Sequence, residues 1–168
     1  RLNMKMTVEK NFVAVLLVAY FVSQAAHKAQ AGFFKQQQAF FIGDALALGP
    51  HWYYSLDDLR RDYGEWISTY TDPKPDRYHA GLKGGQLSQA GFILTLMVRS
   101  LVDRGGYDTE DFCRRMDEDL FPLLDGTPVS GPGGYTSQSI REVWRRRVQQ
   151  KLPWGKTGSH ADTTEAIE

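Results

Sequence analysis

The feature that most constrains the fold of this chain is an apolar helix predicted between Ser88 and Asp103. Its apolar residues cover almost the whole helical wheel: Phe92, Ile93, Leu94, Leu96, Met97, Val98, Leu101 and Val102. Ser88 is a favourable N-cap, and Gly105-Gly106 follows the last turn, so both ends of the helix are marked. Because a helix that is apolar all round needs neighbours on every side, the pattern predicts a position at the centre of a helical domain.

The rest of the chain also has helical rather than strand periodicity. Helices are predicted over 33–48, from Ser55 to Gly64, after Asp108 or Thr109, from Thr136 and from Ala161 onward, with loops over 65–85, 125–135 and 151–159. Pro50 follows the first of these helices, as proline often does after a helix end. No segment alternates apolar and polar residues with a period of two, so the predicted fold class is all-α.

The N-terminus resembles a targeting segment. Eleven apolar residues, 12–22, follow Lys5 and Lys10 and precede small residues that suit a cleavage site. A run this short cannot cross a bilayer, which needs roughly 20 residues, but it suits a secretory signal. We therefore expect 1–31 to be a signal peptide or leader, 32–168 to be the domain, and the protein to be secreted, or otherwise cytoplasmic. The alternative is a buried N-terminal helix.

The charge balance gives no reason to expect a nucleic acid or a membrane as partner. Twenty basic residues match twenty acidic ones, and the run Arg145-Arg146-Arg147 is predicted to be a solvated helix face. Asp57 and Asp58 are interpreted as first-turn charges that favour the helix dipole. The loop Gly131-Pro132-Gly133-Gly134 could cradle a phosphate, but it follows a helix rather than a strand, so a plain turn is the preferred interpretation.

Three segments, in order, resemble the ADP-ribosylglycohydrolase family. Residues 41–49 (Phe-Ile-Gly-Asp-Ala-Leu-Ala-Leu-Gly) resemble its Gly-Asp-Ala-Leu-Gly opening helix. Residues 48–54 (Leu-Gly-Pro-His-Trp-Tyr-Tyr) are similar to the branch that contains jellyfish lens crystallins and selenoprotein J. Residues 87–91 lead into the apolar helix, and 158–166 resemble the Gly/Ser-rich loop that opens a later family helix.

The resemblance implies an orthogonal helical bundle with a cleft that holds ADP-ribose between paired divalent metals. It also implies a longer chain, with a C-terminal aspartate-rich metal motif, so that these residues form an incomplete bundle. Asp44 and His51 would lie near the cleft and contact the substrate. Gly158 and Ser159, at a helix start, would bind a phosphate through backbone N–H groups.

The chain departs from the family pattern at the start of the apolar helix. Ser88, Gln89 and Ala90 align with the Thr-Asp-Asp triplet whose carboxylates bind magnesium in catalytic members. Magnesium prefers hard, anionic oxygen ligands in an octahedron, and the present triplet offers a hydroxyl and an amide. His51 likewise stands where some members have an acidic residue. No metal ligand is therefore assigned.

Two functions remain open from the sequence. One is a hydrolase acting on an ADP-ribosyl or related glycosidic bond, with an ADP-ribose-like small molecule as ligand. The other is a non-catalytic, crystallin-like binding or structural protein, which the replaced triplet favours for the metal-dependent activity. An unrelated helical secreted protein is the third alternative, because a fold does not guarantee a function.

Overall fold

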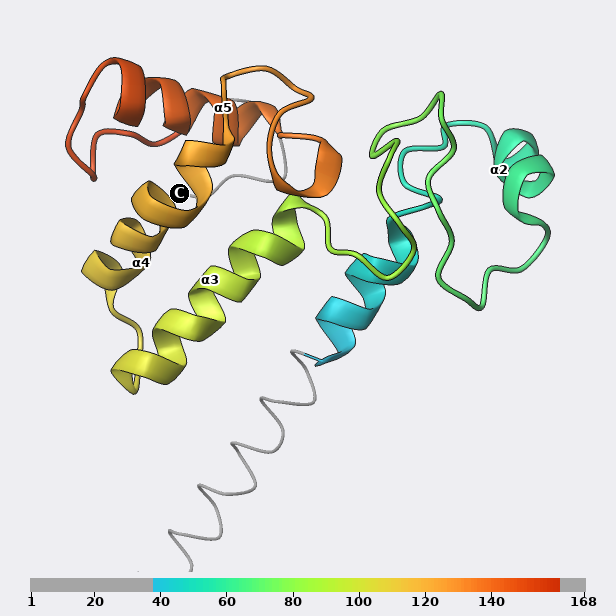
Figure 1. Ribbon diagram of the computed structural model, residues 1–168, viewed down its shortest axis with the longest axis horizontal. Helices are drawn as coiled ribbons and strands as arrows, with labels where there is room; N and C mark the ends of the chain where they lie inside the picture. The colour runs from blue at the N-terminus through green and yellow to red at the C-terminus, as the bar shows by residue number, and fades with distance from the viewer. Residues whose placement is uncertain (1–37, 161–168) are drawn as a thin grey trace, which may run out of the picture. The chain divides into compact units, whose positions relative to one another are not determined.

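The computed structural model describes residues 38–160, and within them the chain is all-helical, with no β-strand (Figure 1). The α-helices are the segment 38–47, α2 (Leu56–Tyr63), α3 (Gln89–Arg104), α4 (Thr109–Arg115) and α5 (Gln138–Trp144). Two π-helical turns, Met116–Leu120 and Arg145–Gln149, directly follow α4 and α5. Two 3₁₀ turns cover Phe121–Leu123 and Pro132–Gly134. The predicted all-α class is confirmed.

The chain divides into two compact units, Arg1–Phe40 and Phe41–Glu168, and the features described below belong to the second. The leader predicted over 1–31 and the helix predicted from Ala161 lie outside the described residues. None of the helices within 38–160 is long and apolar enough to cross a membrane.

The helix ends follow the capping residues of the sequence. The Ser55 hydroxyl accepts a hydrogen bond from the Asp58 N–H at 3.2 Å, and Gly64 ends α2, as predicted. Asp108, one of the two predicted caps, accepts from the Asp111 N–H at 3.0 Å. The helix predicted from Thr136 instead has Ser137 as its N-cap, because the Ser137 hydroxyl accepts from the third N–H beyond it.

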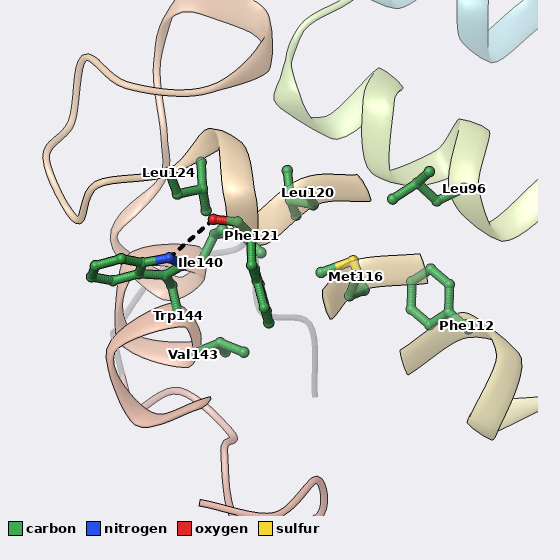
Figure 2. Packing of buried hydrophobic residues seen from close by; sticks show 9 residues of the cluster. All are labelled: Leu96, Phe112, Met116, Leu120, Phe121, Leu124, Ile140, Val143 and Trp144. Carbon is green, nitrogen blue, oxygen red and sulfur yellow. Dashed lines mark hydrogen bonds between the residues drawn. The ribbon is translucent and has the colours of Figure 1, made fainter. Parts of the chain in front are cut away.

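The hydrophobic core joins α3, α4 and α5 (Figure 2). It is built from Leu96, Phe112, Met116, Leu120, Phe121, Leu124, Ile140, Val143 and Trp144. The buried indole N–H of Trp144 donates to the Phe121 carbonyl at 3.2 Å, so this large side chain is buried without an unpaired polar atom. The core thereby holds α3 in place along one side.

Within the described residues α3 has neighbours along one side rather than all round. Of its eight apolar residues only Leu96 is fully buried, and Val102 is 63% exposed. The helix contacts α4 along one side, and the start of α3 faces the short turn Pro132–Gly134. Several of its other apolar side chains line a partly open cavity.

The arginine run is not a plain solvated face, which corrects the sequence interpretation. Arg147 donates to both carboxylate oxygens of Asp117, at 2.9 and 2.8 Å, and the Trp154 indole donates to the same carboxylate at 2.9 Å. Arg145 donates to the Gly126 carbonyl at 3.3 Å, and Arg146 donates to the Gly158 carbonyl. The three guanidinium groups therefore hold loops against the end of α5.

Candidate functional site

A cavity of about 650 Å³ opens between the helix of residues 38–47, the loop that follows it and the N-terminal half of α3. Its polar lining includes Asp44, His51, Ser88 and Gln89, together with the rings of Trp52, His79 and Tyr135. Ile93, Leu94, Met97 and Phe112 form its apolar wall. The structure thus brings the predicted site residues Asp44 and His51 to one cavity, beside the aligned triplet at 88–90.

Asp44 lies in the helix of residues 38–47, and its carboxylate contacts the start of α3. One carboxylate oxygen accepts the Ser88 backbone N–H at 2.8 Å, and the other accepts the Ser88 hydroxyl at 2.5 Å. A negative charge at this position also interacts favourably with the helix dipole of α3. Each oxygen of a carboxylate has a second lone pair, so Asp44 can still accept a hydrogen bond from a ligand.

The close approach of Asp44 depends on a glycine in the first turn of α3. A Cβ at Gly91 would lie 2.4 Å from an Asp44 carboxylate oxygen and 3.0 Å from the Leu87 Cβ. No real side chain tolerates such a contact with a fixed group. Gly91 is therefore required by the position of the carboxylate, which the sequence pattern alone did not reveal.

His51 and His79 form a hydrogen-bonded pair at the cavity. Nδ1 of His51 lies 2.8 Å from Nε2 of His79, and Nδ1 of His79 bonds to the Gly133 carbonyl. Gly133 packs so closely against the start of α3 that a Cβ at this position would lie 2.2 Å from the Gln89 backbone nitrogen. The turn at 131–134, preferred from the sequence over a phosphate cradle, thus supplies the acceptor that orients His79.

The environment of His51 keeps its imidazole neutral. The pKa of His51 is lowered from 6.5 to about 4, chiefly by burial and in addition by the neighbouring His79, while Asp44 opposes both effects. A buried imidazole loses hydration that the charged form needs most, which explains the sign of the largest effect. His51 therefore offers a neutral ring at physiological pH.

Aromatic rings surround the histidine pair. Trp52 stacks on His51 with ring centroids 4.0 Å apart, and its indole meets Tyr78 and Tyr135 edge-on at 4.6 and 4.5 Å. Such edge-to-face pairs are favoured by the ring quadrupoles. Sequence reasoning missed His79 and Tyr135 as site residues, since both lie in irregular segments where no periodicity places them.

The aligned triplet does not fit magnesium. Gln89 is buried, and its side-chain amide accepts from the Ser137 N–H at 3.2 Å and donates to the Ser137 hydroxyl at 3.3 Å. Ala90 contributes a methyl group, and the Ser88 hydroxyl is bound to Asp44. Within 38–160 no three His, Cys, Asp or Glu side chains gather as a metal site. The triplet itself supplies no anionic oxygen, and the nearby Asp44 carboxylate already accepts two hydrogen bonds from Ser88.

Gly158 and Ser159 do not line the cavity that Asp44 and His51 share. The Ser159 hydroxyl donates to the Glu142 carboxylate at 2.8 Å, and the His160 backbone N–H donates to the same oxygen at 3.0 Å. The Glu142 carboxylate thus holds this loop against α5 through the Ser159 hydroxyl and the His160 N–H. The helix expected to follow them lies outside the described residues.

The described residues define an all-helical domain whose cavity combines one carboxylate, a hydrogen-bonded histidine pair and aromatic rings. No family model, curated protein or solved structure matches the chain.

Proposed function

We propose that this chain is an ADP-ribosylglycohydrolase-like domain that binds the sugar part of an ADP-ribose-like small molecule and lacks metal-dependent hydrolysis. The observation that carries the proposal is the meeting of Asp44, His51 and the start of α3 at one cavity of about 650 Å³. That volume lies within the roughly 300–1,000 Å³ usual for small-molecule sites. Residues from the family-like segments 41–54 and 87–91 line it, whereas the described residues of 158–166 do not.

The lining favours a sugar over a diphosphate. Asp44 is the one carboxylate among the residues that line the cavity, and they include no Lys or Arg. Sugar hydroxyls can donate to a carboxylate and to an imidazole nitrogen, whereas a diphosphate needs donors or cations. The apolar wall and the Trp52 ring then suit the carbon-bearing faces of a sugar.

Binding is preferred to metal-dependent hydrolysis because of the donor set at the start of α3. The Gln89 amide is bound to Ser137, and the Ser88 hydroxyl is bound to Asp44. Neither group carries the anionic charge that magnesium prefers. A hydrolase acting on an ADP-ribosyl or related glycosidic bond is the second candidate. It is favoured by His51, whose neutral ring could take up a proton.

Calorimetric titration of the full chain with ADP-ribose tests the proposal. We expect saturable binding that is lost, by at least about tenfold, in Leu94→Trp, because the larger side chain fills the cavity that Leu94 lines. The matched control is Val98→Trp, one turn further along α3 at a half-buried position outside the lining. Absence of binding to the wild type, or equal loss in both variants, would refute the proposal.

An assay for glycosidic hydrolysis distinguishes the two candidate functions. Incubation with an ADP-ribosylated peptide, with and without magnesium, is followed by chromatography of released ADP-ribose. We expect no release above the rate without protein. Release that the Leu94→Trp variant abolishes would favour the hydrolase instead.

A further inference from the structure

While both rings are neutral, the bonds of the histidine pair fix which ring nitrogens carry protons. The Gly133 carbonyl can only accept, so Nδ1 of His79 must donate to it. In a neutral ring the other nitrogen then lacks a proton, and Nε2 of His79 must accept. His51 therefore donates from Nδ1 across the 2.8 Å contact, which leaves its own Nε2 unprotonated.

The unprotonated nitrogen belongs to a ring that lines the cavity. No hydrogen bond to Nε2 of His51 is formed within residues 38–160. The titratable groups around the ring are His79 from the loop, Asp44 from the preceding helix and Tyr135 from the segment before α5. With the histidine pair neutral, none of these groups is a cation, so the unprotonated nitrogen of His51 suits a donor group of the ligand.

We infer that His51 is neutral and acts as a hydrogen-bond acceptor in this cavity, and that its Nε2 receives an O–H or N–H group of the ligand. His79 is the positioning residue, because its bond to Gly133 sets the tautomer of His51 through the contact between the two rings. The identity of the ligand rests on the proposed function. The acceptor assignment itself rests on the geometry of the pair.

The neutral state of His51 supports this role at ordinary and mildly acidic pH. A protonated His51 would need to donate from Nε2 as well, which turns the acceptor into a donor. The lowered pKa of His51, which follows chiefly from burial, keeps the acceptor available below pH 6.5 as long as His79 is also neutral. A ligand hydroxyl placed between Asp44 and His51 would then meet two acceptors and no competing donor charge.

Diethyl pyrocarbonate labelling of the full chain, read by peptide mass spectrometry, tests the assignment without any ligand. The Nε2 lone pair bonds to the carbonyl carbon of the reagent, ethyl carbonate leaves, and the ring then loses its Nδ1 proton to solvent. Only an unprotonated nitrogen reacts. We expect His51 to label almost as fast at pH 5 as at pH 7. A model histidine with blocked termini and a pKa of about 6.5 should label roughly 25-fold more slowly at pH 5 than at pH 7.

His79→Asn tests the positioning role, since asparagine tolerates the left-handed backbone at this position (φ 66°). Loss of the neighbouring imidazole should raise the pKa of His51, so labelling at pH 5 should slow relative to pH 7. A purely structural role would lower stability and leave the pH profile of the folded protein unchanged. That result would overturn the assignment of His79.

Saturating ADP-ribose connects the inference to the proposed function. Protection of His51 from labelling supports both. A flat pH profile with neither calorimetric binding nor protection refutes the proposed function and leaves the acceptor assignment standing. Calorimetric binding without protection, an unlabelled His51, or labelling that slows like blocked histidine overturns the acceptor assignment.

Discussion

Asp44 and Ser88 lie 44 positions apart in the sequence, and two hydrogen bonds join them, one to the Ser88 backbone N–H and one to its hydroxyl. These two hydrogen bonds join the helix of residues 38–47 to the start of α3. Both Asp44 and Ser88 line the cavity. Ser88 also accepts weakly from the Gly91 N–H at 3.4 Å as the N-cap of α3. One serine thus caps a helix and positions the carboxylate of the site.

Ser88→Ala should therefore cost more than the loss of an ordinary cap. We expect the free energy of unfolding to fall by about 1–2 kcal/mol, because the substitution removes the cap and a hydrogen bond to a carboxylate. Ser55→Ala is the matched control, since Ser55 caps the exposed helix α2 and has no carboxylate partner. Urea unfolding of both variants measures the difference, and equal costs would contradict this reading of Ser88.

Two helical glycines give opposite predictions for the same substitution. Gly43→Ala should stabilise the protein by about 0.5–1 kcal/mol, because a Cβ there meets nothing within 4 Å and alanine is the better helix former. Gly91→Ala should destabilise it, since the new methyl group would lie 2.4 Å from the Asp44 carboxylate. Thermal melts of the two variants test the pair. Stabilisation by Gly91→Ala would mean that Asp44 does not sit against α3.

The sequence predicted the local structure better than it predicted the surroundings of α3. Caps such as Ser55, Ser88 and Gly105 act within one turn, so their effects can be read from neighbouring residues. The partial exposure of α3 depends on which elements lie beside it, and helical periodicity carries no such information. A uniformly apolar helix predicts that neighbours are needed on every side, but it does not predict that one side of α3 faces a cavity.

The site shows the same division. Asp44 and His51 were predicted from a resemblance, and they do line one cavity. His79 was not predicted, because its role depends on a contact 28 positions away and on a carbonyl 54 positions away. Gly158 and Ser159 were predicted together with them, yet their bonds link them to Glu142 and Arg146 instead. Non-local contacts of this kind leave no local pattern.

Acid should weaken the fold through His51. Because its folded pKa of about 4 lies below the unfolded value of 6.5, the unfolded chain binds the proton more readily between these values. Stability should be unaffected by this group above pH 6.5 and should decline as the pH falls from 6.5 to about 4. Urea unfolding across that range, compared with His51→Gln, measures the contribution. The variant should show a shallower decline, and an unchanged slope would contradict a neutral His51.

Magnesium separates the binding protein from a metal-dependent hydrolase. A ligand that binds only the folded state raises stability according to its concentration over its dissociation constant. Because the 88–90 triplet offers no carboxylate, we expect millimolar magnesium to leave the melting temperature of the wild type nearly unchanged. A melting temperature that rises by several degrees with magnesium and returns on chelation would contradict the prediction and favour the hydrolase.

Introducing carboxylates at positions 89 and 90 tests whether the start of α3 can gain magnesium binding. Ala90 is exposed at the cavity, so Ala90→Asp adds a carboxylate beside Asp44 without removing a bond. Gln89→Asp sacrifices the two hydrogen bonds to Ser137 and should lower stability in the absence of metal. The double variant should therefore melt lower than the wild type without magnesium and recover part of the loss with it, because anionic oxygens are the ligands that magnesium prefers. Differential scanning calorimetry with magnesium, with calcium and with chelator measures the recovery. A double variant whose melting temperature is the same with magnesium, with calcium and with chelator would show that the start of α3 cannot bind these ions.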